Sequence, residues 1–228
     1  MSTIATNLQA VQSRIAAAAH AARRDVTAVA LLAVSKTFDA TAVSACAAAG
    51  QRTFGENYLQ EALDKITALQ TLNLEWHFIG PIQSNKTRPI AENFQWVHSV
   101  ERERVATRLN DARPASLPPL NVCLQVNVSR EASKSGVAPE GLAALARAVA
   151  VLPRLKLRGL MSIPEPSPDT VLRRSRFALL RELQTQLNHQ GHQLDTLSMG
   201  MSDDLEDAIA EGATLVRVGT AVFGKREG

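Results

Sequence analysis

The sequence predicts an α/β fold: a (β/α)8 TIM barrel of eight parallel strands, with one extra helix before the first strand. Short apolar runs rich in β-branched residues alternate strictly with longer amphipathic stretches. Such alternation is typical of a parallel sheet whose crossovers are right-handed. Eight strand-and-helix units fill the 228 residues, slightly fewer than the roughly 250 residues typical of such barrels. We therefore expect one domain over residues 1–228.

A doubly wound open sheet is the second choice. That fold normally carries a glycine-rich turn directly after its first strand. The expected first strand is followed instead by Ser35, Lys36 and Thr37. The turn sequence therefore favours the barrel.

The elements follow in order along the chain. The leading helix, at about 4–24, repeats apolar residues at helical spacing (Ile4, Leu8, Val11, Ile15) and is expected to cover the bottom of the barrel. Asp39 can cap the alanine-rich helix that stops at Gly50. Strands are expected at 29–34, 52–54, 75–79, 94–97, 121–128, 155–161, 194–198 and 214–218. The later helices are expected at 58–69, 85–92, 101–111, 139–151, 170–190 and 204–211.

Composition excludes several classes of protein. The 25 basic and 22 acidic residues give a formal charge of only +3, and aromatic residues make up 4%, so a nucleic-acid surface is not indicated. No apolar run approaches the 18 to 20 residues, roughly, of a membrane helix, and no signal peptide is recognisable. Cys46 and Cys123 fit neither a disulfide framework nor a metal site. We expect a soluble cytoplasmic protein without a bound metal.

Polar residues and glycines follow three strands that meet in a closed barrel. Lys36 follows the first strand, the segment 198–202 ends the seventh, and the segment 217–220 ends the eighth. Active sites of these barrels lie at the carboxyl ends of the strands, and phosphate sites often follow the seventh and eighth. Closure makes the first and eighth strands neighbours, so these segments should share one rim.

The chemistry of these residues fits a phosphorylated carbonyl compound. Gly219 allows close approach of the backbone, and the hydroxyls of Ser202 and Thr220 can donate to a phosphate. A lysine such as Lys36 can form a Schiff base with an aldehyde. Pyridoxal 5′-phosphate (PLP) supplies both groups, and so does a sugar phosphate in an aldolase. Each residue also has a simpler interpretation: a solvent-facing lysine, a helix cap at Ser202, a turn glycine, or an arginine paired with an acid at Arg217.

The motifs together resemble those of the pyridoxal phosphate homeostasis protein family, also called YggS/PROSC-type PLP-binding proteins. The segments that carry the resemblance are 33–37, 54–58, 77–80, 83–86, 198–202 and 217–220. The resemblance extends from about Leu31 to Gly224. It implies a fold-type III PLP barrel similar to the N-terminal domain of alanine racemase.

The resemblance also implies roles for individual residues. Lys36 would hold PLP covalently as a Schiff base, and Arg217 would face the pyridine nitrogen. The phosphate would be held by Ser202, Gly219 and Thr220, with Met201 and Ser198 lining the same turn. The rest of the pocket would be lined by Asn57, His77 and the segment 83–86, and Lys134 would form a secondary site.

Two positions depart from the family pattern. Phe38 stands where many members carry a second basic residue, so a cationic rim there is in doubt. Pro81 interrupts a stretch where other side chains are usual.

The resemblance implies a protein that buffers or delivers PLP in intracellular vitamin B6 homeostasis, without strong catalysis of its own. An arginine beside the pyridine nitrogen disfavours its protonation and so weakens the electron sink. The chain ends four residues after Gly224, so we expect no second domain with a catalytic tyrosine, and nothing marks Tyr58 as one. A PLP-dependent amino-acid racemase is the alternative, and a Schiff-base aldolase a weaker one. Expected partners are PLP and apo-enzymes that accept it, and the protein is expected to be a monomer or weak dimer.

Overall fold

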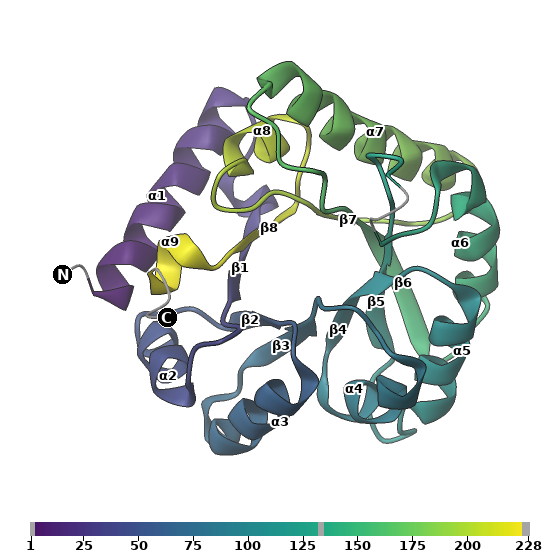
Figure 1. Ribbon diagram of the computed structural model, residues 1–228, viewed down its shortest axis with the longest axis horizontal. Helices are drawn as coiled ribbons and strands as arrows, with labels where there is room; N and C mark the ends of the chain where they lie inside the picture. Colours follow the sequence, from purple (N-terminus) through teal and green to yellow (C-terminus); the bar gives the residue numbers. More distant parts are fainter. Residues whose placement is uncertain (1–2, 132–134, 225–228) are drawn as a thin grey trace.

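A computed structural model describes residues 3–131 and 135–224 as a barrel of parallel strands surrounded by helices (Figure 1). The strands pair in chain order, and the first pairs with the last to close the barrel. They are β1 (Ala30–Val34), β2 (Thr53–Glu56), β3 (Glu75–Phe78), β4 (Trp96–Val100), β5 (Leu120–Gln125), β6 (Leu155–Met161), β7 (Thr196–Ser198) and β8 (Leu215–Val218). The predicted TIM barrel is therefore confirmed.

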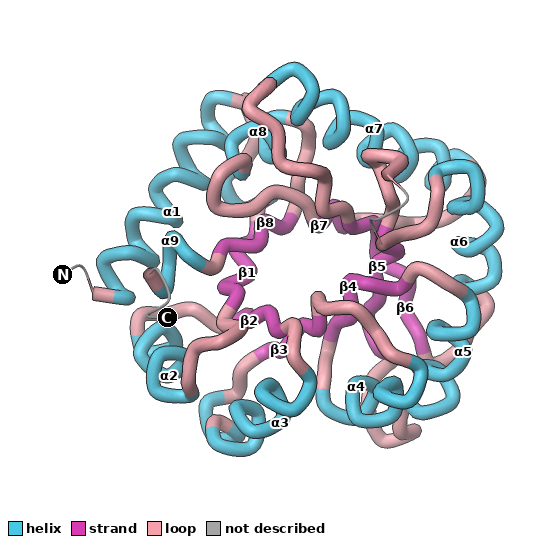
Figure 2. The backbone as a smooth tube through the Cα atoms, in the orientation of Figure 1, coloured by secondary structure: helices cyan, strands magenta, loops and turns pink. Residues whose placement is uncertain are grey.

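Helices form the outer ring, as the tube view shows (Figure 2). They are α1 (Ile4–Ala21), α2 (Ala40–Ala48), α3 (Leu59–Ala68), α4 (Thr87–Asn93), α5 (Glu103–Ala112), α6 (Leu142–Ala150), α7 (Thr170–His189), α8 (Leu205–Ala210) and α9 (Thr220–Phe223). Asp39 caps α2 as predicted, because its carboxylate accepts a 2.8 Å hydrogen bond from the Ala42 amide. None of the helices in the described ranges is both long and apolar enough to cross a membrane.

The leading helix α1 lies in the outer ring and not beneath the barrel, so its predicted location was wrong. Its predicted apolar stripe is buried at Leu8, Val11 and Ile15, and it packs against α2, α8 and α9. The reason lies in the helix that follows β8: α9 has only four residues and cannot cover the adjacent outer face of the sheet. The extra helix fills that position (Figure 1).

The largest departure from the predicted strands is in β4. Its expected end at residue 97 was too early, because the polar pair His98 and Ser99 interrupts the apolar run. Both side chains are buried, and His98 points into the barrel interior, where it bonds to residues of β3 and β7. The barrel therefore contains polar groups in its core as well as at its rim.

Candidate functional site

A cavity of about 280 Å³ opens at the carboxyl ends of the strands. It is lined by residues that follow β1, β2, β7 and β8, where the sequence predicted a site. Seven of the predicted site residues line it: Lys36, Asn57, Met201, Ser202, Arg217, Gly219 and Thr220. Val34, Phe38, Ile79 and Ile163 contribute apolar walls. One cavity thus combines an amine, a guanidinium, two hydroxyls and the Asp203 carboxylate.

Contacts with α3 stabilise the turn that carries Lys36. Lys36 is partly buried, and the next residue, Thr37, has a left-handed backbone with φ of +70°. Such a conformation is unfavourable for a β-branched residue and needs support from its surroundings. The Thr37 amide donates a 2.6 Å hydrogen bond to the Glu61 carboxylate on α3, which helps to fix the direction in which the chain leaves Lys36.

A buried ion cluster lies directly behind this turn. The Lys65 ammonium, 4% exposed, donates to the Ser35 carbonyl at 2.7 Å and pairs with the carboxylates of Glu56 and Glu61. The Ser35 hydroxyl donates a second bond, of 2.6 Å, to Glu56. Burial raises the pKa of Glu56, although its bonds to Lys65 and Ser35 oppose that rise. The sequence analysis missed this cluster, although Lys65 is four residues after Glu61, a spacing that places the two on one helix face.

The turn after β7 depends on Gly200. Its φ is +89°, and a Cβ there would lie 2.5 Å from the Ala208 Cβ. Its carbonyl accepts a 2.9 Å hydrogen bond from the Arg217 amide, which ties the β7 turn to β8. The residue at the N-cap of α8 is Asp204 and not Ser202. Helix capping therefore does not account for Ser202, whose side chain lies at the cavity.

The turn after β8 approaches the backbone of β1 closely at Gly219. A Cβ on Gly219 would lie 3.0 Å from the Val34 carbonyl oxygen. Behind this turn, Phe223 stacks on Phe38 with ring centroids 5.0 Å apart. Phe38 therefore makes an aromatic contact that joins the Lys36 turn to α9.

Arg217 forms the floor of the cavity. It is 3% exposed, and its guanidinium donates to the Ser198 hydroxyl at 2.9 Å and to the Ser162 carbonyl at 2.8 Å. Burial lowers its pKa to about 10, so the group stays cationic at neutral pH. Since both acceptors are neutral oxygens, Arg217 is not an arginine held by a direct bond to an acid.

The cavity also contains an unsatisfied polar atom. The Asn57 Oδ1 is buried and has no hydrogen-bond partner among the described residues. Buried polar atoms are normally paired, so this oxygen is a position for an ordered water or a ligand group to complete. Together with the amine, the cation and the hydroxyls, it fits an anionic aldehyde with polar ring substituents, as PLP is.

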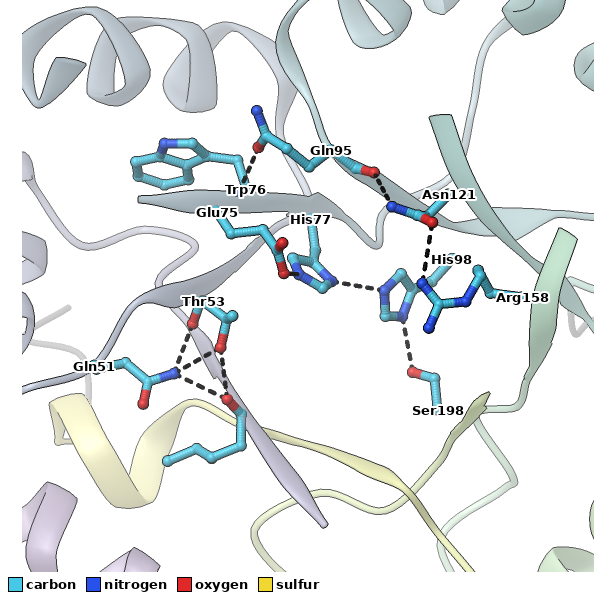
Figure 3. A network of polar contacts seen from close by, with 11 residues as sticks. Gln51, Thr53, Glu75, Trp76, His77, Gln95, His98, Asn121, Arg158 and Ser198 are labelled. Atoms are coloured by element: carbon cyan, nitrogen blue, oxygen red, sulfur yellow. Dashed lines mark hydrogen bonds and ion pairs between the residues drawn. The ribbon is translucent and has the colours of Figure 1, made fainter. Parts of the chain in front are cut away.

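Several predicted residues lie elsewhere. His77 and Ser198 do not line the cavity; both are buried in the barrel interior, in a network that also contains His98 (Figure 3). The segment 83–86 and Tyr58 are likewise absent from the cavity wall, and Pro81 is exposed in the loop after β3. Lys134 lies outside the described residues.

Comparison with known proteins gives consistent results. A family profile described as "Alanine racemase, N-terminal domain" matches residues 6–227. The pyridoxal phosphate homeostasis protein of Pseudomonas aeruginosa is 66% identical over 227 residues, covering 100% of this chain and 97% of that protein. The structure of PipY from Synechococcus elongatus with PLP bound has a TM-score of 0.85 and 37% identity, covering 97% of this chain and 100% of that one.

A more distant structure shares the fold alone. Alanine racemase from Corynebacterium glutamicum has a TM-score of 0.72 and 18% identity. The match covers 99% of this chain and 61% of the racemase.

Proposed function

Since this chain belongs to the pyridoxal phosphate homeostasis protein family, within the wider alanine racemase N-terminal domain family, we propose that it binds PLP in the cavity at the upper rim of the barrel. The observation that carries the proposal is the meeting of Lys36, Arg217 and Thr220 in one cavity. The PLP-bound PipY structure supports it, because that protein shares 37% of its sequence and the whole barrel.

Each side chain of the cavity has a distinct role in the proposal. PLP supplies an aldehyde, a phosphate and a pyridine ring, and Lys36 provides the amine that attaches the aldehyde covalently. Ser202 and Thr220 donate hydroxyl hydrogen bonds to the phosphate, while Gly219 lets the backbone approach it. Met201 packs beside the same turn, and His77 and Ser198 act on the cofactor only through Arg217.

The electrostatics of Arg217 favour storage over catalysis. A guanidinium in contact with the pyridine nitrogen disfavours a second positive charge there. The ring nitrogen would stay unprotonated and would stabilise a substrate carbanion poorly. We therefore propose that the protein buffers or delivers PLP for vitamin B6 homeostasis and has no strong catalytic activity of its own.

The proposal extends to partners and location. Residues 1–228 act as one PLP-binding domain, as a monomer or weak dimer, and apo-enzymes that need PLP receive it. Lys134 is proposed as a secondary PLP site. Cytoplasmic location is supported by Cys46 and Cys123, which are both free and buried thiols. In an oxidising compartment, cysteines more often form structural disulfides.

The test is the visible absorption spectrum of the protein loaded with PLP, before and after borohydride reduction, followed by peptide mass mapping. We expect a yellow protein whose band disappears as a reduced pyridoxyl group is fixed on Lys36. The Lys36→Ala variant should lose the band, whereas Lys156→Ala, at an exposed lysine of β6, should keep it. A label on another lysine, or no label, would contradict the proposal.

A racemase is the alternative activity. It predicts PLP-dependent exchange of the Cα proton of an amino acid with deuterated solvent. Tyr58, the only tyrosine of the sequence, is 54% exposed and lies away from the cavity wall, which leaves Lys36 as a single base. We expect no exchange above the rate of free PLP across a broad amino-acid panel, and faster exchange would favour the racemase.

A further inference from the structure

A continuous chain of side chains crosses the barrel interior beneath the cavity (Figure 3). The Glu75 carboxylate lies 2.9 Å from the His77 Nε2, and the His77 Nδ1 lies 2.9 Å from the His98 Nε2. The His98 Nδ1 lies 2.8 Å from the Ser198 hydroxyl, which also accepts the bond from Arg217. Glu75 is 44% exposed, so the chain connects solvent at the lower end of β3 with the floor of the cavity.

The two ends fix the direction of every hydrogen bond. A carboxylate only accepts and a guanidinium only donates. Glu75 must therefore receive the proton of His77 Nε2, which leaves His77 Nδ1 as an acceptor for the His98 Nε2 proton. His98 Nδ1 then accepts from the Ser198 hydroxyl, whose oxygen accepts from Arg217. With both imidazoles neutral, this assignment satisfies every atom of the chain.

The neutral state of the imidazoles agrees with their surroundings. Burial lowers the pKa of His77, although Glu75 opposes that effect. The pKa of His98 lies well below its usual value because of burial, and then because a protonated His98 would be repelled by a proton on His77 and by the Arg217 guanidinium. His77 is held in place by stacking on Trp96, with centroids 5.3 Å apart and planes within 4°.

Other charged groups lie near each end of this hydrogen-bonded network. At the lower end, Arg158 acts on Glu75 and is itself paired with Asp195 at 2.7 Å. At the upper end, Asp204 and the Cys123 thiol face Arg217. Burial raises the pKa of that thiol to about 12, so it is neutral. A proton added to the imidazoles is therefore felt mainly by Glu75 and Arg217.

One added proton reverses the donor and acceptor roles in half of this hydrogen-bonded network. If His77 becomes an imidazolium, its Nδ1 donates to His98 Nε2, and His98 must then donate from Nδ1 to Ser198. The Ser198 oxygen would accept from both His98 and Arg217, and its own proton would have to turn away. Protonation near the bottom of the barrel thus changes the hydrogen bonding of Ser198, the residue that accepts from the guanidinium at the top.

We propose that Glu75, His77, His98 and Ser198 form a directed proton relay that positions Arg217 and links protonation at the lower end of the barrel to ligand binding at the upper end. The statement about the ligand rests on the proposed PLP site; the statement about the relay does not. An anionic ligand over Arg217 offsets part of its charge, so binding should favour the protonated relay. By linkage, the protonated relay should then bind the ligand more tightly by the same factor.

The first experiment is nitrogen-15 NMR of the histidine rings in the cofactor-free protein at neutral pH. The relay requires that His77 and His98 both carry their proton on Nε2. A proton on Nδ1 of either ring would overturn the proposal. This measurement uses the wild-type chain and therefore does not depend on a variant that folds.

The second experiment compares the titration of these rings with and without PLP. We expect PLP to raise the pH midpoint of the imidazole titration. The expected rise corresponds to about a five-fold coupling between PLP binding and protonation, the lower end of typical values. Ser198→Ala should bind PLP but show a smaller rise, because only the through-space effect of the Arg217 charge on the imidazoles remains. Ser99→Ala removes the hydroxyl of another buried strand serine, which donates to the Gly80 carbonyl and not to the relay, and should keep the rise.

The outcomes separate the relay from the proposed function. PLP binding with no rise in wild type, or with an equal rise in Ser198→Ala, overturns the link between the two ends. Failure of the wild-type protein to bind PLP overturns the proposed function and, with it, the ligand half of the proposal. In that case the Nε2 tautomers in the first experiment still decide the relay itself.

Discussion

Replacing Lys65 by methionine tests the buried ion cluster behind the Lys36 turn. The variant keeps most of the apolar stem of the side chain but removes the ammonium that contacts Glu56 at 2.7 Å and the Ser35 carbonyl at 2.7 Å. Glu56 is fully buried, and its Oε2 already has no partner among the described residues. Breaking a buried pair on one side usually costs about 3–5 kcal/mol because a charge is left uncompensated. We expect a loss in that range at pH 8.

The loss should depend on pH, and its sign follows from Glu56. Burial already raises the pKa of this carboxyl in the folded protein above its unfolded value. Without Lys65 the pKa rises further, so the folded state binds the proton more tightly than the unfolded state. The variant should therefore recover stability as the pH falls below the folded pKa. The greatest slope for one proton is about 1.4 kcal/mol per pH unit.

Urea unfolding of wild type and Lys65→Met at pH 8 and pH 5.5 measures both effects. The Glu56→Gln/Lys65→Met double variant is the matched control, because it removes both charges and should be more stable at pH 8 than the single Lys65 variant. A loss below about 1 kcal/mol at pH 8, which is typical of exposed pairs, would refute the reasoning. So would a loss of equal size at both pH values.

Three further outcomes are expected. Gly219→Ala places a methyl group against the β1 backbone, 3.0 Å from a carbonyl oxygen, and should weaken PLP binding about ten-fold in a spectrophotometric titration; unchanged affinity would show that the turn can shift. Phe38→Ala removes the stack on Phe223 and should lower the free energy of unfolding by about 1–2 kcal/mol, measured by urea, whereas Phe38→Tyr should retain most of it. Burial raises the pKa of Cys46 to about 11 and that of Cys123 to about 12, so both thiols should resist iodoacetamide at pH 8 until urea unfolds the chain. Rapid alkylation of the native protein, followed by mass spectrometry, would contradict that assignment.

The sequence predicted the barrel because its strongest signals are local. The apolar run of β1, the cap at Asp39 and the glycine stop at Gly50 depend on neighbouring residues, and the structure retains all three. The rim residues were predictable for a related reason: closure of a parallel barrel places the carboxyl ends of β1 and β8 side by side. The cavity that joins Lys36 to Gly219 follows from this topology.

The interior was harder to predict because its polar residues look like interruptions in a strand. His98 and Ser99 appear to end an apolar run, yet both are buried in β4. The missed signal is the two-residue period of a strand: His98 follows the inward-facing Trp96 by two positions and so lies on the same face. The pairing of Lys65 with Glu56 depends on contacts between α3 and β2, which local periodicity does not specify.

The polar interior constrains the barrel in addition to the apolar core. An apolar residue at position 98 would leave His77 without its donor and would remove the acceptor of the Ser198 hydroxyl. Each buried group left unpaired in this way costs about 1–3 kcal/mol, so the two together cost about 2–6 kcal/mol, against the roughly 1.5–3 kcal/mol that burying one further apolar side chain returns. All hydrogen bonds of this buried network are satisfied only when every member is present. The geometry that holds Arg217 under the cavity is therefore part of what determines how the strands of the barrel pack.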